Sequence, residues 1–122
     1  MIKIKYKVLL NKEFTDALSA LKGITGIKSA SVLLSAAKIV RALNEHGQDY
    51  NEARDKILKD LEAGPGIVLP EEKQQELNKR ITDLIETEFE IPFQKLSVKD
   101  LPHNTLSPGN IAALEHILVI PD

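Results

Sequence analysis

Two short stretches of the chain alternate between apolar and polar residues, which is the pattern of a half-buried strand. In residues 2–8 (IKIKYKV) the polar positions are all lysine, whereas in residues 88–93 (EFEIPF) they begin with two glutamates. Opposite charges on neighbouring strands favour pairing, and like charges oppose it. We therefore predict a small antiparallel β-sheet with strands near residues 2–10 and 87–98, the second strand being extended by residues 96–98 (LSV).

Between these stretches the apolar residues recur at helical spacing. Asn11 can cap a short helix that ends at Gly23. A much longer helix is predicted from Ser29 to Leu61. Its apolar spacing approximates a coiled-coil seam through Ala36, Val40, Leu43, Gly47, Tyr50, Arg54, Ile57 and Leu61. Gly47 costs about 1 kcal/mol relative to alanine inside a helix, so it can mark a kink, a break or a close crossing. We favour one long helix that is weakest there.

The rest of the chain predicts two more helices. One begins after Pro70, with acidic residues in its first turn, and the short linker before it favours an antiparallel helical hairpin. Ser107 and Pro108 suit the N-cap and first position of a C-terminal helix of roughly three turns, which must dock to be stable. The predicted fold is a single α+β domain over residues 1–122: a long-helix hairpin packed with a small antiparallel sheet and a short C-terminal helix.

The composition argues against several classes of partner. The net charge is -2, so no broad basic field is available to hold nucleic acid or an anionic membrane. The chain has no cysteine, which excludes disulfides and thiolate metal sites. No apolar run approaches the ~20 residues of a membrane span, and the N-terminal residues have no apolar core of a signal peptide. We therefore expect a cytoplasmic protein with no membrane contact.

The sequence does not contain familiar motifs for catalysis or metal binding. His46, His103 and His116 do not have the spacing of metal ligands. There is no Gly-x-Ser-x-Gly elbow, and the glycines on either side of Pro65 are not followed by the Lys-Ser/Thr of a phosphate loop. We therefore predict that the protein is not an enzyme and binds neither a metal nor a cofactor, and we assign no catalytic residue.

The stretch LSPGNIAALE, residues 106–115, carries a family resemblance. It resembles the closing motif Ser-Pro-x-Asp/Asn-Ile/Leu-x-Ala-Leu-Glu of a widespread group of small phage-encoded proteins of unknown function. The order of the predicted elements is similar to theirs, although Gly109 and His116 depart from the motif. The resemblance implies a phage or prophage origin, and therefore the cytoplasm of an infected or lysogenic bacterial host. It brings no catalytic residues with it.

A binding or assembly protein remains, and we expect a homo-oligomer because the seam and the open sheet edges need to be covered. Our first hypothesis is an anti-defence protein that sequesters a small nucleotide immune signal in a pocket between protomers, where cations and amide-type donors hold the phosphates. The candidate ligand-binding residues are Arg54, Arg41, Arg80, His103, Asn104 and Thr105. The alternative is a phage assembly protein, chaperone or host-factor-binding protein that acts through protein–protein contacts.

Arg54 is the most suggestive of these candidates, because it falls on the predicted seam of the long helix and not on its polar face. A purely structural role competes with this hypothesis, since the apolar stem of an arginine can cover a helix edge while its charge stays in water. Nucleotides would separate the two functional hypotheses. A sequestering protein gains thermal stability when its nucleotide binds, and a partner-binding protein does not.

Overall fold

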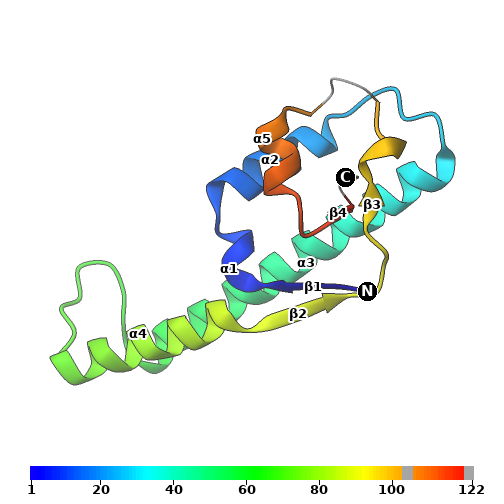
Figure 1. The fold of residues 1–122 in the computed structure, drawn as a ribbon. Coiled ribbons are helices and arrows are strands. Elements are labelled where there is room, and N and C mark those ends of the chain that lie inside the picture. Colours follow the sequence, from blue (N-terminus) through cyan, green and yellow to red (C-terminus); the bar gives the residue numbers. More distant parts are fainter. Residues whose placement is uncertain (103–105, 120–122) are drawn as a thin grey trace.

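The computed structural model describes residues 1–102 and 106–119, and Figure 1 shows their arrangement. The elements are β1 (Ile2–Lys5), α1 (Tyr6–Leu9), α2 (Lys12–Lys22), α3 (Ala30–Asp60), α4 (Glu71–Glu86), β2 (Glu88–Ile91), β3 (Leu96–Ser97), a 3-10 turn (Val98–Asp100), α5 (Pro108–Ala113) and β4 (Leu118–Val119). The fold is α+β, as predicted, with two sheets of two strands each in the described part of the chain. One half of α3 supports most other elements, and its second half projects with α4 as a two-helix arm (Figure 1).

The antiparallel pairing of the first two strands is confirmed. The register places Lys3 opposite Glu90 and Lys5 opposite Glu88, so the opposite charges that motivated the prediction do face each other. β1 is shorter than predicted, because its partner strand begins only at Glu88. The Tyr6 N–H still donates to the carbonyl of the extended Thr87 at 3.0 Å. Beyond that residue the partner segment is the helix α4, and the chain forms the single turn of α1.

The prediction that residues 96–98 extend this sheet is wrong. β3 begins in this segment and pairs in parallel with β4, close to the C-terminal end of the described chain. The chain leaves β2 at Pro92, which has no N–H to donate to a ladder. The Phe93 N–H then donates to the Ile91 carbonyl at 2.8 Å. This tight turn separates β3 from the first sheet.

α3 is one continuous helix, as predicted, and it runs through Gly47 without a break. The Ser29 hydroxyl caps its first turn by accepting a hydrogen bond from the Val32 N–H. α4 returns antiparallel along the second half of α3, which confirms the predicted hairpin (Figure 1). One side of the hairpin is joined by an ion pair in which Arg80 Nη2 lies 3.2 Å from Asp60 Oδ2. No side chain of α4 is buried, so the arm has little core of its own.

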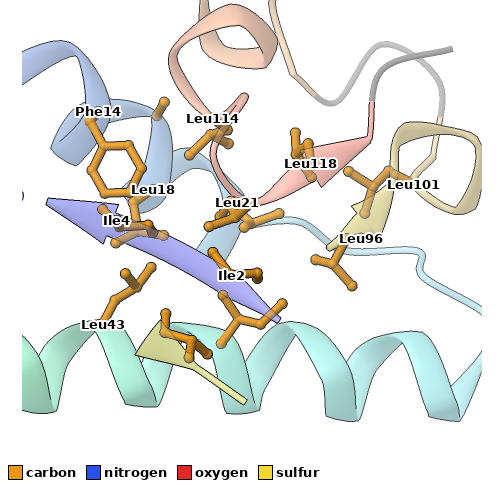
Figure 2. Packing of buried hydrophobic residues seen from close by; sticks show 14 of the residues in the cluster. Ile2, Ile4, Phe14, Leu18, Leu21, Leu43, Leu96, Leu101, Leu114 and Leu118 are labelled. Carbon is orange, nitrogen blue, oxygen red and sulfur yellow. The ribbon is translucent and has the colours of Figure 1, made fainter. Parts of the chain in front are cut away.

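The core lies where β1 is enclosed between α2 and α3 (Figure 2). Its buried side chains are Ile2, Ile4, Phe14, Ala17, Leu18, Leu21, Ile39, Leu43, Phe89, Ile91, Leu96, Leu101, Leu114, Ile117 and Leu118. They come from both ends of the chain and from the first half of α3, but not from α4. The hydrophobic stabilisation of the fold is therefore concentrated at one end of the long helix.

The C-terminal helix is confirmed at its start but is shorter than predicted. The Ser107 hydroxyl accepts a hydrogen bond from the Asn110 N–H at 3.1 Å, which is the predicted N-cap. α5 then ends at Ala113, because the following residues turn so that Leu118 can pair with Leu96 in the second sheet. The short helix packs against α2, so it is docked on its own chain.

Candidate functional site

α3 carries two adjacent stripes of residues, both at the alternating three- and four-residue spacing that keeps side chains on one helix face. The first, which we call the inner stripe, faces the rest of the chain. It consists of Ala36, Ile39, Leu43, His46, Tyr50, Ala53 and Ile57. Ile39, Leu43 and Tyr50 are buried. The inner stripe therefore holds the long helix to the core and to α4.

The second stripe, which we call the outer stripe, lies beside the first and has the same spacing. It consists of Leu33, Ala37, Val40, Asn44, Gly47, Asn51, Arg54, Leu58 and the C-cap residue Leu61, which directly follows the helix. None of these residues is buried, although the stripe is apolar at both ends and carries a single charge. Such a face of a helix is normally covered by another element.

The seam predicted from the sequence is a mixture of these two stripes. Half of its positions belong to the inner stripe, as Leu43 does, and half belong to the outer stripe, as Val40 does. The prediction of a coiled-coil-like spacing is correct, but two faces share it. The amides Asn44 and Asn51, which belong to the outer stripe, were not among the predicted site residues. The sequence signal for them is a pair of asparagines seven residues apart, which lie between the apolar residues at the two ends of the stripe.

Two hollows lie beside the outer stripe, where α2 and α3 face each other. The larger, of about 450 Å³, is lined by residues that include Phe14, Leu18, Asn44, Gly47, Gln48 and Asn51. The smaller, of about 190 Å³, is lined by residues that include Leu21, Ile24, Ile27, Leu33, Ala37 and Val40. Each helix contributes residues one turn apart to the two hollows, so the hollows follow one another along α3. We call the two hollows together the groove; its wall on α3 includes the outer stripe from Leu33 to Asn51, whereas Arg54, Leu58 and Leu61 line neither hollow.

Gly47 lies in this groove, and its contacts with the described residues do not explain why it is glycine. A Cβ atom added there would meet nothing within 4 Å. The residue sits inside α3, where glycine costs about 1 kcal/mol relative to alanine. Neither close packing nor an unusual backbone conformation requires a glycine at this position. A requirement for an open surface would account for it.

An aromatic cluster joins α1 and β2 to the inner stripe. The rings of His46 and Phe89 stack with their centroids 4.2 Å apart, and Tyr6 packs on Phe89 at 4.8 Å. Burial, reinforced by the nearby charge of Asp49, raises the pKa of the Tyr6 hydroxyl above its ordinary value. His46 Nδ1 is buried without a hydrogen-bond partner among the described residues. None of these three rings lines either hollow, but Tyr50, whose ring lies 6.1 Å from that of Tyr6, lines the larger one. The cluster therefore joins the elements and meets the larger hollow only at Tyr50.

The predicted ligand-binding arginines are not brought together by the described chain. Arg41 and Arg54 are exposed and lie about 20 Å apart along α3, at a rise of 1.5 Å per residue. Arg54 Nη2 approaches the neighbouring Asp55 at 3.9 Å, and Arg80 is held by its ion pair with Asp60. The remaining candidates, His103, Asn104 and Thr105, lie outside the described residues. A phosphate site built from the three arginines of one chain is therefore not formed.

Comparison with known proteins does not identify a functional site. No protein-family model matches the chain, and no curated protein or solved structure matches it significantly. Within residues 1–102 and 106–119, no group of three histidine, aspartate or glutamate side chains is placed to hold a metal ion. In the same residues no helix is both long enough and apolar enough to cross a membrane.

Proposed function

We propose that this protein is a non-enzymatic, oligomeric binding protein that acts through protein–protein contact, and that the outer stripe of α3 is its binding face. The observation that carries the proposal is the stripe itself: it is heptad-spaced and apolar at both ends, and five of its nine residues are exposed while the other four are only half-buried. A stripe with this spacing matches a helix laid along it, because side chains of one helix fit between those of the other. The groove beside α2 provides the second wall for such a helix.

This proposal favours the second of the two functional hypotheses drawn from the sequence. Nucleotide sequestration needs several cations around one set of phosphates, and the exposed Arg41 and Arg54 are separated along α3. Sequestration would therefore need a second chain to complete the site. A thermal-shift screen with cyclic dinucleotides, cyclic trinucleotides and ADP-ribose derivatives tests it, since a selective shift would favour a nucleotide ligand over protein contact. The phage origin remains a prediction from the C-terminal motif.

Site-specific photo-crosslinking tests the proposed binding face. A photoreactive amino acid is placed at Gln48, which lines the groove, and in a matched protein at Lys56, which is exposed on the side of α3 opposite the outer stripe. Purified protein is irradiated alone and in a bacterial extract, and the adducts are identified by mass spectrometry. We expect protein adducts from Gln48 and none from Lys56. Absence of adducts from Gln48 in both samples would overturn the proposed function.

A further inference from the structure

We propose, on the basis of the protein-contact function above, that the outer stripe packs against the outer stripe of a second copy of this chain. The two α3 helices run antiparallel, and the twofold axis crosses the interface at the level of Asp49 along the helix. In heptad notation the a positions are Ala37, Asn44, Asn51 and Leu58, and the d positions are Leu33, Val40, Gly47, Arg54 and Leu61. Two antiparallel helices related by a perpendicular twofold axis place each a residue beside a d residue of the other helix.

In the register centred on Asp49, side chains of like polarity meet. The contacting pairs are Ala37 with the partner's Leu61, Val40 with the partner's Leu58, Asn44 with the partner's Arg54, and Gly47 with the partner's Asn51. The symmetry repeats each pair on the other side of the axis. Apolar contacts therefore lie toward both ends of the interface, and polar contacts lie around its centre. Polar residues at a and d positions are known to specify register and orientation in coiled coils.

Other arrangements of the same two stripes do not match in this way. Sliding the partner by one heptad would place Val40 against the partner's Asn51 and Ala37 against the partner's Arg54, leaving polar groups against apolar ones. A parallel pair would place Arg54 beside the partner's Arg54, and their charges would repel. From Ala37 to Leu61 the outer stripe is thus self-complementary in one direction and one register, and Leu33 lies beyond the paired length.

Charges at the edge of the stripe support the same register. In an antiparallel pair the e positions of the two helices lie on the same side of the interface, and charged residues there set orientation. Arg41 and Asp55 both occupy e positions, and the proposed register places each beside the other residue of the partner, twice per dimer. Arg41 makes no ion pair within the described part of its own chain, and the Asp55 side chain is 67% exposed. Gln48, between them, faces the partner's Gln48 at the axis.

The smaller hollow beside α2 lies where this register places apolar residues of the partner. The partner's Leu58 and Leu61 lie opposite Val40 and Ala37, two of the apolar residues that line the smaller hollow. Near the axis, the absent side chain of Gly47 leaves space for the partner's Asn51. A second copy therefore accounts for the apolar hollow, for the amides and for the glycine within a stable helix.

Charge reversal tests the register. We expect the wild-type protein to sediment in the micromolar range with twice its chain mass of 13.5 kDa. Arg41→Asp and Asp55→Arg should each raise the dissociation constant of the dimer by about tenfold, because each reversal creates two like-charge contacts. The double variant R41D/D55R should return it to within about threefold of the wild-type value. Lys56→Asp, on the opposite face of α3, is the matched control and should change little.

A cysteine placed at the axis tests the direction of the helices. Because the natural chain has no cysteine, Gln48→Cys provides a single thiol that a short bis-maleimide should link to the same residue of the partner. Arg41→Cys should link efficiently to Asp55→Cys in a mixture of the two variants, and poorly to itself. In a parallel pair the opposite would hold, since each position would meet its own copy.

The possible results separate this inference from the proposed function. Restoration of the dimer by the double reversal, together with cross-linking at Gln48→Cys, supports the antiparallel dimer. A monomer throughout the micromolar range, or a dimer indifferent to both reversals, overturns it. If photo-crosslinks from Gln48 then lead only to other proteins of the extract, the proposed function stands with a different partner. If Gln48 gives no adduct of any kind, both proposals fail.

Discussion

The inner and outer stripes of α3 share one helix and one spacing, yet they differ in composition. The inner stripe has large aliphatic and aromatic residues where it meets the core, and Leu43 is 2% exposed. The outer stripe has amides and a glycine in its centre, and Leu33 at its end is 47% exposed. Stability alone does not favour an exposed apolar end or a glycine within a helix. The difference indicates that the inner stripe is adapted to folding and the outer stripe to contact with another helix.

The largest expected effect comes from truncating a leucine to alanine in each stripe and comparing the losses of stability. Leu43→Ala should lower the free energy of unfolding by about 3 kcal/mol, because it removes buried contacts and leaves a cavity. Leu33→Ala should change it by less than about 0.5 kcal/mol, because that residue is 47% exposed and lies outside the buried core. Urea denaturation followed by circular dichroism measures both. A large loss for Leu33→Ala in dilute protein would mean that the outer stripe is part of the fold.

Hydrogen exchange should show the contrast between the arm and the core. No side chain of α4 is buried, whereas all the buried side chains of α3 lie between Ile39 and Tyr50. We expect α4 to exchange about 100-fold faster than that segment, through local opening of the arm. Mass spectrometry of peptic fragments measures the two rates. Equal protection would show that the arm opens only when the whole chain unfolds.

Gly47→Ala should have a smaller effect, and in the stabilising direction. The new methyl group meets none of the described atoms of its own chain within 4 Å, and alanine restricts the unfolded state more than glycine does. The free energy of unfolding of the monomer should rise by about 0.5–1 kcal/mol. Denaturation in dilute protein measures this gain. A loss of stability would show that the helix needs glycine for its own packing, and the contrast between the stripes would weaken.

The smallest expected effect concerns the exposed charges near the base of the arm. Hydrogen bonds from Lys5 and Lys7 lower the pKa of the Glu86 carboxyl below its ordinary value. A carboxyl whose pKa is lower in the folded state adds stability above its unfolded pKa, and this contribution disappears as the pH falls through the folded pKa. Glu86→Gln should therefore lower the melting temperature slightly at pH 7 and not at pH 3. An equal effect at both values would exclude the ion pairs as its cause.

Much of the fold could be predicted from short-range sequence features, namely strand charges and helix caps. The opposite charges of residues 2–8 and 88–93 identified the correct strand pair, and Asn11, Ser29 and Ser107 act as helix caps. These features depend on neighbours within a few residues or on a simple charge match. The ligand-binding residues stay a prediction. The sequence suggested arginines as phosphate-binding residues because of their charge alone. The structure shows that two of them, Arg41 and Arg54, lie far apart on one helix.

The sequence by itself determined that α3 would be a long helix with coiled-coil spacing, because helical periodicity is read from residues three and four apart. Only the tertiary structure decided which of its two stripes is buried, because that depends on where β1 and α2 meet the helix. It also decided that β3 pairs with β4 and ends the C-terminal helix early. Contacts between segments far apart in sequence make these choices, and the composition of one segment does not encode them.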